Sequence, residues 1–135
     1  AADYDAVIVP GGFGVAKNLS TFAVAGPEMA TNEAVLGFLQ TMRGLKKPIG
    51  LVCIAPVLAP KVFGAGVTCT LGSDDDDAAK AVIVMGAKHQ ACAVEEICID
   101  EQNNLIATPA YMLAGRISEA SSGISRLVSA VLERA

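Results

Sequence analysis

The sequence predicts an α/β fold with a mixed sheet, and three observations support this. Short apolar runs typical of buried strands alternate with segments whose apolar residues recur at helical spacing. Two strand-like segments within 97–107 flank a turn, which predicts a hairpin rather than another crossover. The hydrophobic content of 53% predicts a substantial core, and 135 residues is the length of one domain, which we place at 1–135.

The first strand and the first helix can be placed from local signals. The strand Ala6–Val9 is expected to end at Pro10-Gly11-Gly12, because proline cannot continue a ladder and glycine favours no regular conformation. A helix is predicted after Thr31 and Asn32, either of which can cap it. Basic residues within 43–47 suit the C-terminal end of this helix. Its apolar face consists of Val35, Leu36, Phe38, Leu39 and Met42.

A second buried strand leads directly to a cysteine. Pro48 precedes the apolar strand Ile49–Val52. The sequence 53–56 then turns straight into an apolar helix that is expected to end near Gly64. Cys53 is therefore predicted to lie at the junction between a strand and a helix.

The second half of the chain continues the alternation. Val67–Leu71 can form a third strand, and Ser73 or Asp74 is expected to cap a helix that ends near Gly86. The hairpin joins 97–100 to 105–107 through the turn-like 101–104. A C-terminal helix follows, and Gly123 allows it to pack closely at its middle. Its apolar face consists of Ile117, Ala120, Ile124, Leu127, Val128 and Val131.

Composition argues against two classes of function. A net charge of −4, the absence of tryptophan and an aromatic content of 4% give neither a basic field nor stacking platforms, so nucleic-acid binding is not expected. The longest charge-free apolar stretch, 48–60, is shorter than a bilayer span and contains Pro56. We recognise no secretory signal peptide, which would have a positively charged start, an apolar run and a cleavage site with small residues. We therefore expect a soluble intracellular protein that does not bind membranes.

Cys53 is the candidate for chemistry. A nucleophile at a tight strand-to-helix turn is exposed above the sheet, and the N–H groups at the start of the new helix face whatever it attacks. The same helix start favours a thiolate. Gly11 and Gly12 end a neighbouring strand, so their backbone can approach the substrate oxygen and form an oxyanion hole with Ile54. The alternative is that Cys53 is a small buried hydrophobe and the glycines only form a turn.

His89 is the sole histidine, so any Cys-His mechanism within the chain must use it. The alternative for His89 is a surface or edge position without a catalytic role. The four cysteines have irregular spacing and no C-x-x-C pair, which predicts free thiols and no metal site. The glycines at 11–14 match neither a dinucleotide nor a P-loop motif, so dinucleotide binding is weakly supported.

Three segments resemble a known family. Residues 5–20, 48–56 and 107–112 are similar to the ElbB-like proteins, in the PfpI-type branch of the class-I glutamine amidotransferase-like superfamily. The resemblance implies a flavodoxin-like three-layer sandwich with a mostly parallel sheet and a homodimer without metal or organic cofactor. It also implies that Cys53 is the nucleophile, with the N–H groups of Gly12 and Ile54 facing it.

The activity that the resemblance implies is a glyoxalase-type lyase reaction or deglycation. A small dicarbonyl such as glyoxal would be converted to glycolate through a Cys53 hemithioacetal, or a glycated substrate would be repaired. The implied location is cytoplasmic, or mitochondrial for a eukaryotic source. The alternative is a non-catalytic redox-sensing or regulatory binding protein, which the family links to isoprenoid metabolism.

The chain departs from the family pattern in two ways. The family has a strand, a helix and a strand before Asp5, including a glutamate that hydrogen-bonds the nucleophile, and the sequence lacks this part. We expect an incomplete domain whose activity depends on a separate or additional N-terminal segment and whose sheet has an exposed edge. No histidine follows His89, so the Cys-His-Glu chemistry of glutamine hydrolysis is not expected.

Overall fold

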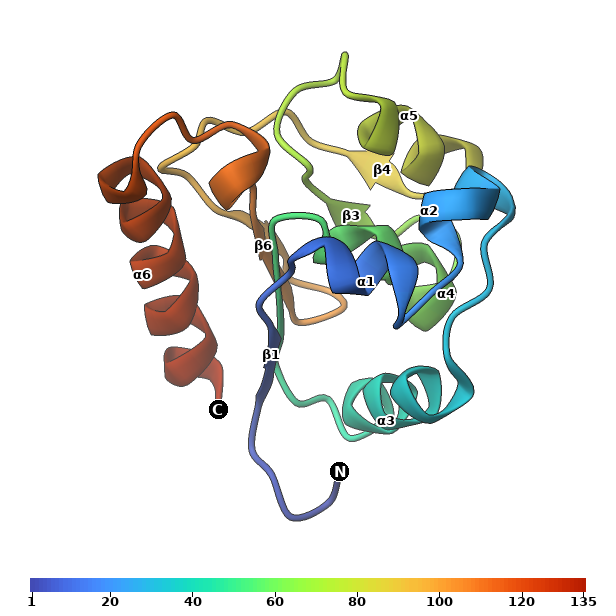
Figure 1. Ribbon diagram of the computed structural model, residues 1–135. Coiled ribbons are helices and arrows are strands. Elements are labelled where there is room, and N and C mark those ends of the chain that lie inside the picture. The colour runs from blue at the N-terminus through green and yellow to red at the C-terminus, as the bar shows by residue number, and fades with distance from the viewer.

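A four-stranded mixed sheet organises the chain, and the computed structural model describes all of residues 1–135 (Figure 1). The strand order is β1-β2-β6-β5. Three strands are parallel, and β5 pairs antiparallel with β6 as the predicted hairpin. The strands are β1 (Val7–Val9), β2 (Ile49–Val52), β5 (Cys98–Asp100) and β6 (Leu105–Thr108). The α/β prediction with a mostly parallel, flavodoxin-like sheet is confirmed.

Helices cover both faces of this sheet and complete three layers (Figure 1). The helix α6 (Ile117–Arg134) packs on β2 and β6, and an apolar cluster that includes Ile106 and Leu127 fills this side. On the other face α3 (Glu33–Gly44) and α4 (Ala59–Phe63) enclose the larger core. No helix in the structure combines the length and the apolarity needed to cross a membrane. The remaining helical elements are α1 (Phe13–Lys17), α2 (Phe22–Ala25), α5 (Asp77–Val84), η1 (Gly26–Glu28), η2 (Ala55–Leu58) and η3 (Ala110–Met112).

The cap of α3 confirms one of the two predicted candidates. The Asn32 side-chain oxygen accepts hydrogen bonds from the N–H groups of Ala34 at 3.0 Å and Val35 at 3.2 Å. It thereby satisfies two of the donors that a helix start leaves without a partner. Thr31, the other candidate, instead forms an isolated bridge with Ser20.

The segment after β2 forms two helical elements rather than one. The first turn, η2, is a 3₁₀ helix, and α4 continues from it without a gap. Pro56 and Pro60 each lie in the first positions of one of these elements, where a missing N–H costs no hydrogen bond. The predicted apolar helix is present, with a tighter first turn.

The strand predicted within 67–71 is present but shorter than predicted. Only Thr68–Cys69 forms a strand, β3, and it pairs with β4 (Lys88–His89) in a separate two-stranded parallel sheet. The strand β4 was not predicted, because two residues are too few to show alternation. Each strand forms because it pairs with a segment about twenty residues away in the chain. Local sequence does not specify this pairing.

The predicted cap of α5 was also wrong. Asp76 caps this helix, and its Oδ1 accepts the Ala78 N–H at 2.8 Å. Ser73 accepts the Asp75 N–H at 3.1 Å, and Asp74 bonds the His89 ring at 2.7 Å. Ser73 and Asp74, the two candidates named from sequence, therefore form other hydrogen bonds, and Asp76 directly before the helix caps it.

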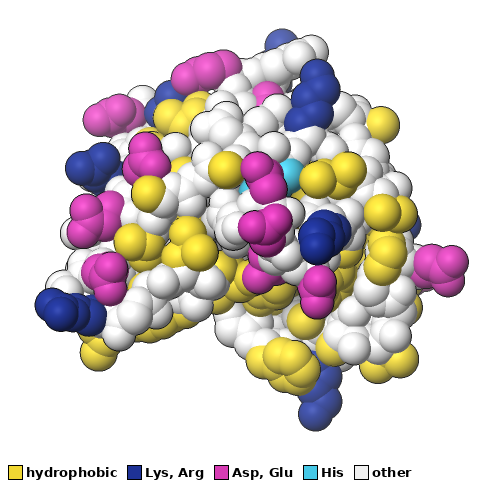
Figure 2. All heavy atoms as spheres, turned by 90° about the horizontal axis from the view of Figure 1, so that it is seen from above, with side chains coloured by type: hydrophobic (Ala, Val, Ile, Leu, Met, Phe, Trp, Pro, Cys, Tyr) yellow, Lys and Arg dark blue, Asp and Glu magenta, His cyan; other side chains and the backbone are white.

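The outer edge of β1 has no neighbouring strand. β1 is at one end of the sheet and pairs only with β2. In Figure 1 it lies at the front, between α6 and α3, with no element covering it. The view from above shows a hollow with hydrophobic side chains at the front of the molecule (Figure 2). Ile8 on β1 is 37% exposed and Leu132 on α6 is 67% exposed, so the core is not closed along this edge.

The contact of α6 with the sheet depends on Gly123. A Cβ at this position would lie 2.5 Å from the Val94 carbonyl oxygen and 2.7 Å from the Thr108 hydroxyl. Both distances are shorter than any normal contact, and a backbone carbonyl cannot rotate away as a flexible side chain can. The prediction that this glycine allows close packing is confirmed.

We expect Gly123→Ala to lower the free energy of unfolding by about 1–3 kcal/mol, because overpacking moves α6 from the sheet. Helix propensity alone would change stability by about 1 kcal/mol in the opposite direction. Urea unfolding measures the difference, and Ser122→Ala on the exposed face of α6 is the matched control. A Gly123→Ala protein as stable as the wild type would contradict the packing argument.

Candidate functional site

Cys53 lies at the end of β2 in a strained backbone conformation. Its φ angle is +61°, in the left-handed region that non-glycine residues rarely adopt. The Cys53 N–H donates to the Thr108 carbonyl oxygen at 3.0 Å, which extends the pairing of β2 with β6 by one residue. The thiol is half-buried and free. A strained, partly exposed cysteine between a strand and a helical turn has the geometry of a nucleophile elbow.

Gly11 brings the turn after β1 against this elbow. A Cβ on Gly11 would lie 2.6 Å from the Val52 carbonyl oxygen and 2.9 Å from the Cys53 Cβ. Gly11 also has a φ of +91°, so both space and conformation require glycine. Gly12 follows with a φ of +85° and precedes α1 as its N-cap. The structure therefore places Gly11 directly against Cys53, and Gly12 is the next residue along the chain.

Three N–H groups at this turn lack an acceptor within the chain. The backbone N–H groups of Gly11, Gly12 and Ile54 donate to no backbone carbonyl and to no side chain. They belong to the residues predicted to form an oxyanion hole. Unpaired donors at the mouth of a helical turn can stabilise negative charge on a substrate oxygen. Their catalytic use stays a prediction.

His89 is engaged elsewhere. Its imidazole is fully buried, Nε2 accepts the Leu71 N–H at 2.9 Å, and Nδ1 lies 2.7 Å from Asp74 Oδ1. Because Nε2 is an acceptor, the neutral ring carries its proton on Nδ1 and donates it to Asp74. His89 thus joins β4 to the segment after β3 and forms no hydrogen bond with Cys53. Its predicted catalytic role remains untested, and its bonding supports a structural one.

The other three cysteines are buried free thiols. Burial, together with the nearby Cys98 and Asp100, raises the pKa of Cys69 from 9.0 to about 12. Burial, with Cys92 and Asp100, raises the pKa of Cys98 to about 12 as well. Burial and the Glu96 charge raise the pKa of Cys92 in spite of an opposing hydrogen bond from Thr70. These environments disfavour the reactive thiolate.

Asp100 is the charge beside these thiols, and sequence reasoning assigned it no role. Burial alone would raise its pKa, but hydrogen bonds from Thr68 and Asn103 lower the pKa below its usual value. One of these bonds, from the Thr68 N–H at 2.8 Å, joins β3 to β5. Asp100 therefore connects the small sheet to the main sheet. No group of three His, Cys, Asp or Glu residues is arranged to hold a metal ion.

Sequence reasoning also missed two residues that shape the site. Thr108 holds the elbow through its carbonyl, and its hydroxyl donates to the Glu96 carbonyl oxygen at 2.8 Å. Ala110 is fully buried, has a φ of +46° and belongs to the apolar cluster against which Cys53 packs. Neither has a local signal, because the register of β2 with β6 decides what lies beside Cys53.

Two curated relatives match nearly the whole chain. A mitochondrial ES1 protein homologue of Rattus norvegicus is 45% identical over 141 residues, covering 98% of this chain and 53% of the relative. A second relative is the mitochondrial glutamine amidotransferase-like class 1 domain-containing protein 3 of Homo sapiens. It is 43% identical to this chain, which covers 52% of its length. The chain thus spans about half the length of these relatives. No protein-family model matches it.

Solved structures share the fold. An isoprenoid biosynthesis protein with an amidotransferase-like domain from Ehrlichia chaffeensis superposes with a TM-score of 0.87 at 26% identity, over 98% of this chain and 60% of that chain. DJ-1beta of Drosophila melanogaster superposes with a TM-score of 0.57 at 21% identity, over 96% of this chain and 61% of that chain. The second similarity concerns the fold alone.

The fold and the site together define an α/β domain with a cysteine at a strand-to-helix elbow. The chain is similar in sequence to a relative named for a glutamine amidotransferase-like class 1 domain and to an ES1 protein homologue, and it shares its fold with an amidotransferase-like domain. The narrower resemblance to ElbB-like proteins stays a prediction.

We expect a thiol reagent to modify Cys53 alone in the folded protein. The other three thiols are buried and have raised pKa values, so the concentration of accessible thiolate at each is low. Brief treatment with iodoacetamide at pH 7.5 should add one label, assigned to Cys53 by peptide mass spectrometry. Unfolding in urea is the control and should give four labels. Labelling of Cys69 before Cys53 would refute the prediction.

Stability should fall in alkaline solution. The pKa of Cys69 and Cys98 is about 12 in the folded protein and 9.0 without the fold, so the unfolded chain loses these protons first. Their contribution is complete below pH 9 and decreases as the pH rises toward 12, at most by about 1.4 kcal/mol per pH unit for each thiol. Urea unfolding from pH 8 to 10.5 measures the slope. Cys98→Ala should reduce it, and an unchanged slope would contradict the assignment.

Proposed function

We propose that this chain carries the nucleophile half of a cysteine-dependent glyoxalase or deglycase that acts on small dicarbonyl or glycated substrates. The observation that supports this most directly is the strained Cys53 beside three N–H donors without partners. A thiolate needs an electrophilic carbon, and unpaired donors suit the oxyanion that forms when it adds to a carbonyl. The resemblance to ElbB-like proteins supports the same reaction.

The proposed steps balance without an external oxidant or cofactor. The Cys53 thiolate adds to one aldehyde carbon of glyoxal, and the oxyanion is held by Gly12 and Ile54 and protonated to a hemithioacetal. A base removes the hydrogen from that carbon, and a proton is returned to the neighbouring carbon, which gives a thioester. Water cleaves the thioester to glycolate and frees the thiol. The carbon bonded to sulfur is oxidised by two electrons to the carboxylate level, its neighbour is reduced by two electrons to the alcohol level, and one water is consumed overall.

The base in this proposal comes from outside the 135 residues. Both nitrogens of His89 are already bonded to Leu71 and Asp74. The chain spans about half of its curated relatives, and the edge of β1 is open next to the site. We propose that an additional N-terminal segment pairs with β1 and supplies the carboxylate that moves the proton. Since three curated relatives are named mitochondrial, we also propose a mitochondrial location.

A second candidate is redox sensing or regulatory binding through the same residue. Cys53 is the one cysteine that is not buried, while the three others are. Such a thiol can be oxidised by a peroxide to a sulfenic acid, with one water released. The Ehrlichia relative is named an isoprenoid biosynthesis protein, which supports a regulatory link to that metabolism. This role requires no general base.

Cys53→Ala and Cys53→Ser should reduce glycolate formation from glyoxal by at least about a thousandfold, because they remove the nucleophile. The assay is run on the chain extended to the length of its relatives, with glycolate followed by NMR. Cys92→Ala, which alters a buried thiol, is the matched control and should keep full turnover. Turnover retained in Cys53→Ala would sink the proposal. Peroxide-selective oxidation of Cys53 without any turnover would favour the sensor.

A further inference from the structure

Two exposed aromatic residues lie in the turns next to the turn of Cys53. Phe13 is 71% exposed and begins α1 directly after Gly12, and Tyr111 is 60% exposed in η3 directly after Ala110. The chain has two tyrosines and four phenylalanines, and an exposed ring lacks the stabilisation that burial provides. Two of the three aromatic residues that are mostly exposed therefore come from these turns.

The sheet order places these two turns on opposite sides of Cys53. β1, β2 and β6 are parallel neighbours, so the turns that follow them leave the same sheet edge, with the turn of β2 in the middle (Figure 1). Neighbouring strands are about 4.8 Å apart, which puts the turns that carry Phe13 and Tyr111 about 10 Å apart. A planar group midway between them lies about 5 Å from each, which is a distance at which aromatic rings stack.

The backbone of Ala110 determines where Tyr111 emerges. Ala110 is fully buried and has a φ of +46°, a conformation that non-glycine residues rarely adopt. It belongs to the apolar cluster against which Cys53 packs. The chain therefore passes beside the buried side of Cys53 at Ala110 and reaches the surface one residue later, at the ring of Tyr111.

The three turns that meet at this edge carry no charge. Residues 10–16, 53–60 and 109–115 include no aspartate, glutamate, lysine, arginine or histidine. An ionised substrate group brought to these turns would lose hydration without gaining an ion pair from them. The turns therefore suit a substrate whose non-reacting part is neutral and apolar.

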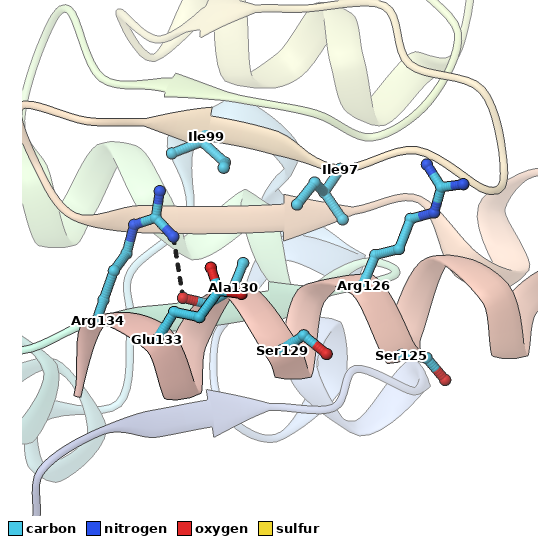
Figure 3. Close-up of a pocket in the computed structure, with 8 residues that line it drawn as sticks. All are labelled: Ile97, Ile99, Ser125, Arg126, Ser129, Ala130, Glu133 and Arg134. Carbon is cyan, nitrogen blue, oxygen red and sulfur yellow. Dashed lines mark hydrogen bonds between the residues drawn. The ribbon is translucent and has the colours of Figure 1, made fainter.

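A concave surface elsewhere on the domain has the opposite character. A groove of about 470 Å³ lies between α6 and β5, with Ile97 and Ile99 on its β5 side (Figure 3). Arg126, Glu133 and Arg134 line it from α6 (Figure 3). Charged side chains thus border this groove, whereas the turns around the reactive thiol offer rings and backbone N–H groups.

We propose that Phe13 and Tyr111 are the two walls of a slot above Cys53, and that this slot binds the aryl or other apolar substituent of a neutral α-oxoaldehyde. The inference rests on the proposed function and names the part of the substrate that does not react. The aldehyde carbon meets the thiolate while the substituent lies between the two rings. Glyoxal itself has no substituent that could fill the slot.

The test compares two alkylating reagents on the 135-residue chain. The Cys53 sulfur displaces bromide from 2-bromoacetophenone, which has a phenyl ring on the carbonyl beside its reactive carbon, and iodide from iodoacetamide, which has an amide nitrogen there. Peptide mass spectrometry follows the Cys53 adduct, and the ratio of the two rate constants isolates the effect of the ring. Phe13→Ala and Tyr111→Ala should each lower this ratio at least about fivefold, because each removes a stacking partner. Tyr111→Phe should keep the ratio within about twofold of the wild type, because the ring remains.

Tyr4→Ala is the matched control for the loss of an exposed ring. Tyr4 is 59% exposed and lies near the start of the chain, with its ring centroid 6.3 Å from that of Phe38. This change should leave the ratio unaltered, and thermal unfolding checks that each variant folds. A ratio that neither Phe13→Ala nor Tyr111→Ala lowers, or that Tyr4→Ala lowers equally, would overturn the proposal.

Turnover by the chain extended to the length of its relatives separates this inference from the proposed function. Phenylglyoxal takes up one water and gives mandelate, and its kcat/KM relative to that of glyoxal should fall at least about fivefold in both alanine variants. Glyoxal turnover with a relative kcat/KM that neither variant changes would overturn the inference and leave the proposed function standing. Alkylation that depends on the rings, without turnover of either substrate, would support the slot and overturn the proposed function.

Discussion

The parallel pairing of β2 with both β1 and β6 is the constraint on which the site depends. In this register Val9 lies beside Leu51, and Val52 lies beside Thr108. The turns that leave all three strands therefore meet at one edge of the sheet, as parallel strands in α/β folds require. A shift of one residue would turn the side chains of β2 to the opposite faces. The contact of Gly11 with Cys53 and the hydrogen bond from Cys53 to Thr108 both follow from this register.

The surroundings of each thiol separate one cysteine from the other three. Cys53 ends a strand at the surface, where a helical turn begins and unpaired N–H groups collect. Cys69 and Cys98 lie where two sheets meet, near a carboxylate that is itself held ionised by hydrogen bonds. The thiol of Cys53 is thus available for chemistry. The other three thiols act as small apolar groups, because burial penalises the thiolate.

Two surfaces of the domain are not covered by the chain itself, and they differ in character. The edge of β1 offers unused backbone donors and acceptors between two apolar helix faces, which suits a further strand. The groove beside α6 has isoleucine and alanine in its lining together with side chains of both charges from α6.

The sequence by itself determined the alternation of strands and helices, the elbow at Cys53 and the turn at Gly11 and Gly12. These features depend on hydrophobic period, proline and glycine, whose effects act within a few residues. Only the tertiary structure decided that β3 and β4 form a separate sheet, that Asp76 caps α5 and that the His89 ring bonds Leu71 and Asp74. Each of these depends on which of several equivalent polar groups or short strands meet in space. That choice is made by packing between segments far apart in the chain, and no local pattern encodes it.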